Sequence, residues 1–324
     1  MKTNAAKRNK IDIVAITPVL FLLVLVIFYS VSTNNFFSIT NLINIGRQIS
    51  ITGIMAIGVT FVILLGEIDL SLAVILSFSG MIVSGLSLGR YFGMNPMPVW
   101  LCIIITLIIG ALLGAIAGFA NAKLRIPGFM ATLAIMYMSK GLMLMLTDAQ
   151  PLFGLPKQLT YWGSGYLFDS IPVIIVVFLI VFVAASIVLK HTVFGRNIYA
   201  IGGNAVAARM SGINVVKYKI IAFVICTTLS ALAGILMVGR IGSGQVTAGE
   251  GLDMQPIAAA VLGGTSLMGG KGTVWGTLLG VLIMGVLVNG LNMLGAGTEV
   301  QSLATGFVLF AAVAFNMAVS KKNA

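Results

Sequence analysis

Apolar residues recur in long blocks along the whole chain, and polar residues are confined to short segments between them. Most blocks are close to the roughly 20 residues that a helix needs to cross a bilayer. No polar stretch is long enough to form a separate domain. The pattern predicts a single all-α polytopic membrane domain, 1–324, with about ten transmembrane helices. We place these spans at 12–32, 45–65, 70–88, 99–122, 129–147, 170–189, 218–239, 256–268, 274–293 and 300–319.

Two places do not fit a plain series of spans. The stretch Gly66–Ser71, GEIDLS, carries two carboxylates and fits either a short cytoplasmic turn or backbone that is unwound inside the membrane. The segment 256–268 would rise only about 20 Å as a helix, against a hydrocarbon core of about 30 Å. It therefore indicates a broken or re-entrant helix. Because interrupted segments at matching positions are typical of repeat-built transporters, one hypothesis relates spans 2–5 and 7–10 as an inverted repeat.

Glycine also follows a pattern in two of the predicted spans. It recurs at every fourth residue, at 110, 114 and 118 and again at 272, 276 and 280. Each series gives one helix face a smooth stripe on which another backbone can approach closely. We favour packing within one subunit over a subunit interface.

Charge changes the picture in one respect. Only 8% of residues are charged, whereas soluble domains have about 25%, so the outer surface of the protein must face lipid. The net charge of +11 comes from Lys and Arg scattered between apolar blocks, which argues against nucleic acid as a partner. With the N-terminus inside, most of these basic residues fall in cytoplasmic segments. We therefore expect both termini to be cytoplasmic and the first span, which has no A-x-A site after it, to be uncleaved.

The composition excludes most catalytic chemistry. The chain has one histidine, His191, and its two cysteines, Cys102 and Cys226, lie inside apolar runs. Neither a metal site nor a catalytic triad fits these residues. The segment Gly263–Gly272 resembles a phosphate-binding loop, but an extra glycine intervenes and Gly272 follows the lysine, where Ser or Thr is required. We expect no cofactor and no enzymatic activity.

A few polar residues are candidates for the solute pathway. Glu67 and Asp69 lie at a span boundary where water can solvate them, and capping the helix that starts near Ser71 is as good an interpretation as solute contact. Lys140 interrupts the fifth span; we favour a lysine that snorkels to the outer surface over a pathway residue. The candidate pathway set is Glu67, Asp69, Ser71, Lys140, Thr265 and Ser266.

The most informative polar segment is the loop 190–217, called the coupling loop below. Asn204 is a good N-cap and Gly212 a good helix stop around one short, alanine-rich helix. A passive interfacial anchor usually has Trp, Phe or Leu on its buried side, and this helix offers mainly Ala and Met. The pattern favours a ridge that docks into a groove on a partner.

At this point the residues resemble a known family almost end to end, over about 15–320. The chain is similar to the permease subunits of ABC importers for monosaccharides of the ribose, xylose and galactose type. The resemblance is carried by GEIDLS at 66–71, FGRNIYAIGGNAVAARMSGI at 194–213 and IAAAVLGGTSLMGGKGTVWGT at 257–277. The sequence differs from the usual pattern of this family at Leu72-Ala73, at Lys140 and at Met254-Gln255-Pro256, and these differences leave the identity of the sugar open.

The resemblance implies a permease in the bacterial plasma (inner) membrane that lies in lipid and pairs with a second copy of itself. It also implies a separate ATPase subunit with two nucleotide-binding domains, which hydrolyses ATP, and an extracytoplasmic solute-binding protein. The coupling helix would lie in Gly203–Gly212. The residues expected to couple transport to the ATPase are Gly203, Asn204, Ala207, Ala208, Arg209 and Gly212.

Two alternatives stay open. An ABC permease could carry a nucleoside, a branched-chain amino acid or a signalling molecule instead of a sugar. An ion-coupled secondary carrier would need an essential acid near the middle of the membrane and would act without partners.

Overall fold

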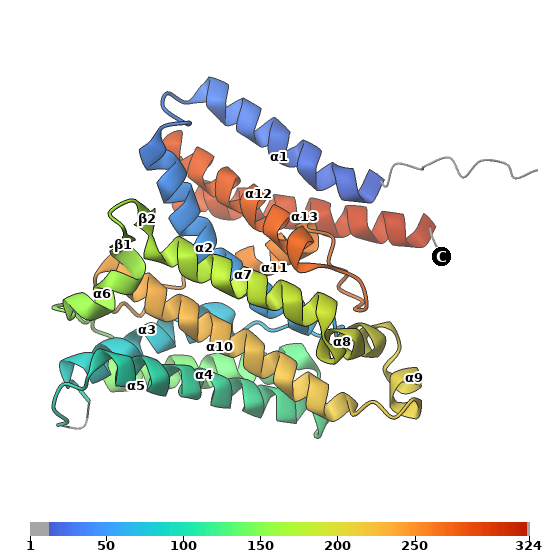
Figure 1. Cartoon of the computed structure of the whole chain (residues 1–324), viewed down its shortest axis with the longest axis horizontal. Helices are drawn as coiled ribbons and strands as arrows, with labels where there is room; N and C mark the ends of the chain where they lie inside the picture. The colour runs from blue at the N-terminus through green and yellow to red at the C-terminus, as the bar shows by residue number, and fades with distance from the viewer. Residues whose placement is uncertain (1–12, 92, 323–324) are drawn as a thin grey trace, which may run out of the picture.

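The computed structural model describes residues 13–91 and 93–322, so the basic N-terminal segment and the first residue of the first predicted span lie outside the described residues. The described chain is an elongated helical bundle with one short β-hairpin (Figure 1). Its elements are α1 (Ile13–Ser32), α2 (Ile39–Ile63), α3 (Leu72–Leu88), α4 (Val99–Ala122), α5 (Gly128–Thr147), α6 (Lys157–Ser164), β1 (Tyr166–Leu167), β2 (Ile171–Pro172), α7 (Val173–His191), α8 (Val193–Gly203), α9 (Ala205–Met210), α10 (Val215–Ile241), α11 (Gln255–Leu262), α12 (Val274–Met293) and α13 (Thr298–Lys322).

The helices support a polytopic all-α membrane protein. Among the described residues, six helices are long and apolar enough to cross a bilayer: α2, α4, α5, α7, α10 and α12. Shorter apolar helical stretches lie at Thr17–Ser32, Leu72–Leu88 and Thr298–Ala314. Each of the ten predicted spans coincides with a helix, although the lengths differ.

The eighth predicted span, 256–268, is a helix only in its first part. Helix α11 has eight residues and ends at Leu262, and irregular backbone follows up to Thr273. Four glycines in this loop, Gly264, Gly269, Gly270 and Gly272, have positive φ angles of 88°, 83°, 70° and 147°. Residues other than glycine rarely adopt this conformation, which does not continue a helix. The segment is thus a half-length helix followed by a loop.

Helices α2 and α10 form the centre of the bundle. Helix α10 packs against α2, α3, α4 and α6, and α2 also contacts α7, α11 and α12. The first glycine stripe explains how α4 comes so close: a Cβ on Gly110 would lie 2.7 Å from the Ala231 Cβ, and one on Gly118 would lie 2.7 Å from the Ile220 Cα. The stripe therefore packs inside one chain, as favoured from the sequence.

The opposite face of α4 carries large apolar side chains. Trp100, Ile104, Ile108, Leu112 and Ile116 are all exposed and recur at intervals of four residues. A helix with small residues toward the bundle and bulky apolar residues outward is the pattern expected for a helix at the lipid boundary.

The two ends of the bundle differ in character. Helices α8 and α9 lie at the end where α13 finishes, whereas α6 and the hairpin of β1 and β2 lie at the opposite end (Figure 1). The coupling loop and the C-terminus are thus on the same side of the molecule.

Candidate functional site

The coupling loop folds into two short helices. Thr192 caps α8 by accepting the Gly195 N–H at 3.2 Å. Asn204 caps α9, and its Oδ1 accepts the N–H groups of Val206 and Ala207, each at 3.0 Å. Gly212, with φ of 83°, lets the chain turn away after α9. The short helix predicted between Asn204 and Gly212 is confirmed; α8 was not predicted.

Most of the residues expected to couple to an ATPase are exposed. Gly203, Asn204, Ala207, Arg209 and Gly212 are all exposed, as a docking surface requires. Ala208 differs, because it is 5% exposed and belongs to the hydrophobic core. The large exposed apolar side chains of α9 are those of Val206 and Met210.

Helix α8 touches both interruptions in the helical bundle. The backbone at Gly202 lies against the Leu64 carbonyl and the Gly270 amide, and Gly270 N–H donates to the Leu64 oxygen at 2.9 Å. Gly66 lies close to the Met268 carbonyl. We call these five residues the backbone junction, because main-chain atoms make its contacts. It joins the end of α2, the loop after α11 and the coupling loop.

Glu67 links the first break to two further helices. Its Oε1 accepts from Lys219 Nζ of α10 at 2.6 Å, and its Oε2 accepts the Gly128 N–H of α5 at 3.0 Å. Gly128 is the first residue of α5, where backbone N–H groups lack helical partners and favour a negative charge. The sequence singled out Glu67 but neither partner, since Lys219 lies 152 residues away.

Asp69 is fully buried, so the prediction that water solvates it is wrong. Its Oδ1 accepts from the N–H of Ser71 at 2.9 Å and from the Ser71 hydroxyl at 2.6 Å. The neighbouring Leu70 N–H donates to Thr132 of α5 at 3.1 Å. Packing of α5 and α10 over the break excludes water. Ser71 at the start of α3 supplies the hydrogen bonds of Oδ1, in line with the capping interpretation, whereas Oδ2 has no hydrogen-bond partner among the described residues.

The remaining pathway candidates, Lys140, Thr265 and Ser266, make no hydrogen bond to Glu67 or Asp69 in the described part of the chain. Lys140 is exposed on α5, twelve residues after Gly128 and roughly 18 Å further along the helix. It makes no hydrogen bond or ion pair within the described part of the chain, which agrees with a snorkelling lysine. Thr265 is fully buried, whereas the partly buried Ser266 accepts the Met268 N–H at 3.3 Å.

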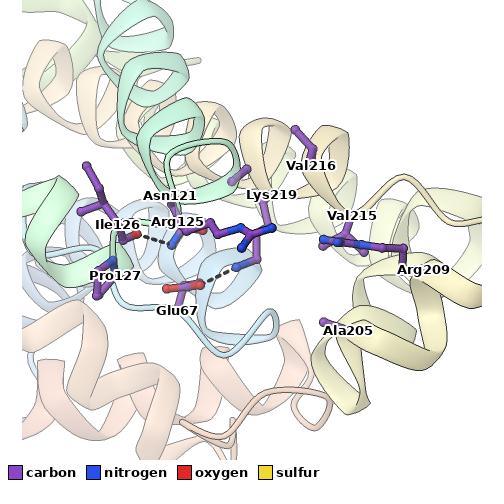
Figure 2. Close-up of a pocket in the computed structure, with 11 residues that line it drawn as sticks. Glu67, Asn121, Arg125, Ile126, Pro127, Ala205, Arg209, Val215, Val216 and Lys219 are labelled. Atoms are coloured by element: carbon purple, nitrogen blue, oxygen red, sulfur yellow. Dashed lines mark hydrogen bonds and ion pairs between the residues drawn. The ribbon is translucent and has the colours of Figure 1, made fainter.

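A cavity of about 300 Å³ opens between α9, α10 and the turn that joins α4 to α5. Figure 2 shows Glu67 and Lys219 paired inside it, with Arg125 beside them and Arg209 reaching in from α9. Arg209 therefore faces this cavity as well as solvent. The structure thus brings the end of α2, the loop after α11 and the coupling loop together at the backbone junction, and Glu67 beside it links the first break to α5 and α10.

Comparison with known proteins gives a consistent result. Residues 41–313 match the family described as the branched-chain amino acid transport system permease component. The ribose import permease of Haemophilus influenzae is 42% identical over 90% of both chains, and that of Bacillus subtilis is 44% identical over 91% of this chain and 90% of its own. The D-allose transport system permease of Escherichia coli is 34% identical over 92% and 90%. No solved structure matches the chain.

Proposed function

The chain belongs to the family of branched-chain amino acid transport system permease components, and from that premise we propose that it is the membrane subunit of an ATP-driven ABC importer for a monosaccharide. A sugar is the proposed solute because the chain is similar, over nine-tenths of its length, to permeases named for ribose. Relatives named for xylose and allose are 31% and 34% identical. Ribose or a closely related sugar is the cargo that we propose.

The proposed division of labour follows from the site. The chain forms the pathway, a separate ATPase with two nucleotide-binding domains hydrolyses ATP, and an extracytoplasmic binding protein delivers the sugar. Residues Gly203–Gly212 contact the ATPase in this proposal, and the exposed side chains of α9 support it. The direct contact of α8 with both breaks supplies a route by which an ATPase could bias two conformations of the pathway.

We also infer a ten-span topology with two inverted repeats, spans 2–5 and 7–10. The pattern of helix contacts supports this repeat, because exchanging the corresponding helices of the two halves turns one observed contact into another. Helix α10 packs on α4 as α2 packs on α12, α10 on α3 as α2 on α11, and α3 on α5 as α11 on α13. These pairings match when α2, α3, α4 and α5 correspond to α10, α11, α12 and α13.

The proposed location is the bacterial inner membrane, with both termini in the cytoplasm and with two copies of the chain in the working transporter. The bias of Lys and Arg toward the predicted inner loops supports this orientation. The C-terminus and the coupling loop also share one end of the bundle (Figure 1). An ion-coupled carrier is less well supported, because Glu67 is engaged in holding α5 and α10 to the first break, and Asp69 is buried and bonded to Ser71 at the start of α3.

Transport in proteoliposomes tests the proposal. The chain would be reconstituted with its ATPase and binding protein, and uptake of labelled ribose, xylose and allose would be measured with each component omitted in turn. Sugar uptake that needs ATP and both partners is the expected result. Labelled leucine tests the alternative that the solute is a branched-chain amino acid, as the family description suggests. Uptake by this chain alone under an ion gradient would refute the ABC mechanism.

A further inference from the structure

The cavity beside α9 carries more positive charge than the chain neutralises. Arg125, Arg209 and Lys219 line it, together with one carboxylate, Glu67, so its net charge is +2. Glu67 and Lys219 pair at 2.6 Å, and their side chains are only 17% and 18% exposed. Neither guanidinium group makes a hydrogen bond or ion pair with any residue that the structure describes. Two guanidinium groups are thus available to a ligand.

The same cavity contains a buried acceptor that lacks a donor. Asn121 lines it and is 5% exposed. Its Nδ2 donates to the Ile126 carbonyl at 3.0 Å, which fixes which amide atom is the oxygen (Figure 2). The Oδ1 has no hydrogen-bond partner in 13–91 or 93–322. Because an unpaired buried acceptor is unfavourable, this atom indicates that a hydroxyl or amine of a ligand belongs here.

The two observations together define the chemistry of the ligand. Guanidinium groups recognise phosphate oxygens through paired, charge-assisted hydrogen bonds. An amide oxygen, in contrast, accepts from a hydroxyl. A volume of about 300 Å³ is at the lower end of small-molecule sites, which span about 300–1,000 Å³. We propose that the cavity binds a phosphate-bearing polyol, with the phosphate on Arg125 and Arg209 and a hydroxyl on Asn121.

Such a ligand has two possible sources on this side of the membrane. One is a soluble sugar phosphate, and the other is the glycerol phosphate headgroup of phosphatidylglycerol in the adjacent leaflet. Both have a phosphate next to free hydroxyls, so the residues alone recognise the chemistry that they share. The experiment below separates the two.

Binding would join two parts that are otherwise separate. Arg209 lies on α9, whereas Asn121 lies at the end of α4 and Arg125 in the turn after it. A bridging phosphate would hold α9 against the bundle and so favour one of its positions. This consequence rests on the proposed function, in which α9 contacts the ATPase: a bound phosphorylated sugar would then slow uptake of more sugar. The binding itself does not depend on that function.

The test uses the full-length protein in lipid nanodiscs, without partners. Isothermal titration in phosphatidylcholine discs compares ribose 5-phosphate with ribose and inorganic phosphate. A second arm replaces part of the lipid with phosphatidylglycerol and follows thermal unfolding. The variants are Arg125→Gln and Arg209→Gln. Lys217→Gln, which removes the same charge from an exposed position outside the cavity, is the control.

Loss of one charge-assisted contact should weaken binding by about tenfold or more in each arginine variant and leave the control unchanged. Binding of ribose 5-phosphate in phosphatidylcholine discs supports the soluble source. Stabilisation by phosphatidylglycerol that both arginine variants lose supports the lipid source. The proposal is overturned if neither arm separates the arginine variants from Lys217→Gln, or if ribose 5-phosphate binds but ribose or inorganic phosphate binds equally tightly. A failed transport assay would not affect any of these outcomes.

Discussion

Replacing Gly202 by alanine tests whether the coupling loop is held rigidly against both breaks. A Cβ at this position would overlap the Leu64 carbonyl oxygen and lie 2.5 Å from the Gly270 nitrogen. Both neighbours are backbone atoms, which cannot rotate away as the end of a side chain can. Helix α8 must therefore move off the backbone junction, or the hydrogen bond between Gly270 and Leu64 must open.

The expected cost follows from these contacts. Overpacking a well-packed site costs about 1–3 kcal/mol, and loss of one backbone hydrogen bond adds about 0.5–1.5 kcal/mol. Alanine favours a helix over glycine by about 1 kcal/mol, which offsets part of this cost. The free energy of unfolding should thus fall by about 1–3 kcal/mol. Gly203 is an ideal control, because it is the next residue in α8 and a Cβ there meets no atom within 4 Å.

The assay compares Gly202→Ala with Gly203→Ala in two measurements. Thermal unfolding in detergent, followed by tryptophan fluorescence, should show a lower melting temperature for Gly202→Ala alone. ATP-driven uptake in proteoliposomes, measured beside wild type, should fall strongly for Gly202→Ala. Gly203 lies in the proposed ATPase contact, so Gly203→Ala is the control for stability alone. Equal stability of the two variants would refute the close three-way contact at the backbone junction.

Three further predictions concern other contacts. Gly114→Ala places a Cβ 2.8 Å from a backbone carbon of α10 and should lower the free energy of unfolding by about 1–3 kcal/mol. Gly141→Ala, where a Cβ meets no neighbour within 4 Å, should leave it unchanged, and thermal unfolding of both variants checks this. Glu67→Gln and Lys219→Met should each destabilise the protein by about 1–3 kcal/mol, because each leaves a partly buried partner unpaired, and a double variant that costs the full sum of the two would contradict direct coupling. Met210→Glu, on the exposed face of α9, should abolish binding of the ATPase in a pull-down while Met210→Leu retains it, and equal binding would exclude this face from the interface.

The positions of the long helices could be predicted because the bilayer imposes a minimum length on apolar segments. Even the irregular places were detectable, since the glycines after Leu262 and the acids at 66–71 interrupt otherwise apolar runs. Helix α8 was missed for a physical reason. Some of its residues, such as Ile198 and Ile201, lie in the core and others face solvent. The sequence therefore has no continuous apolar block from which the helix could be predicted. Helix α6, Lys157–Ser164, was missed because it is short and half polar.

The site was less predictable than the fold, because its contacts join distant parts of the chain. Glu67 could be singled out as an unusual charge, but its pairing with Lys219 depends on how α2 and α10 cross. The position of Asp69 at a span boundary suggested access to water, yet neighbouring helices bury it completely. The sequence indicates where a helix ends, but tertiary packing determines whether water reaches that end.

The composition of the backbone junction bears on how movement could pass through it. Its contacts are made by main-chain atoms, between three glycines and the backbone of Leu64 and Met268, so no flexible side chain can absorb a displacement of α8. The junction also joins one break from each half of the proposed repeat, 64–71 from the first and 263–273 from the second. A shift of the coupling loop would consequently act on both halves at once. In the proposed function, rigid contact between the loop and these two segments is a way for the ATPase to bias two conformations of the pathway together.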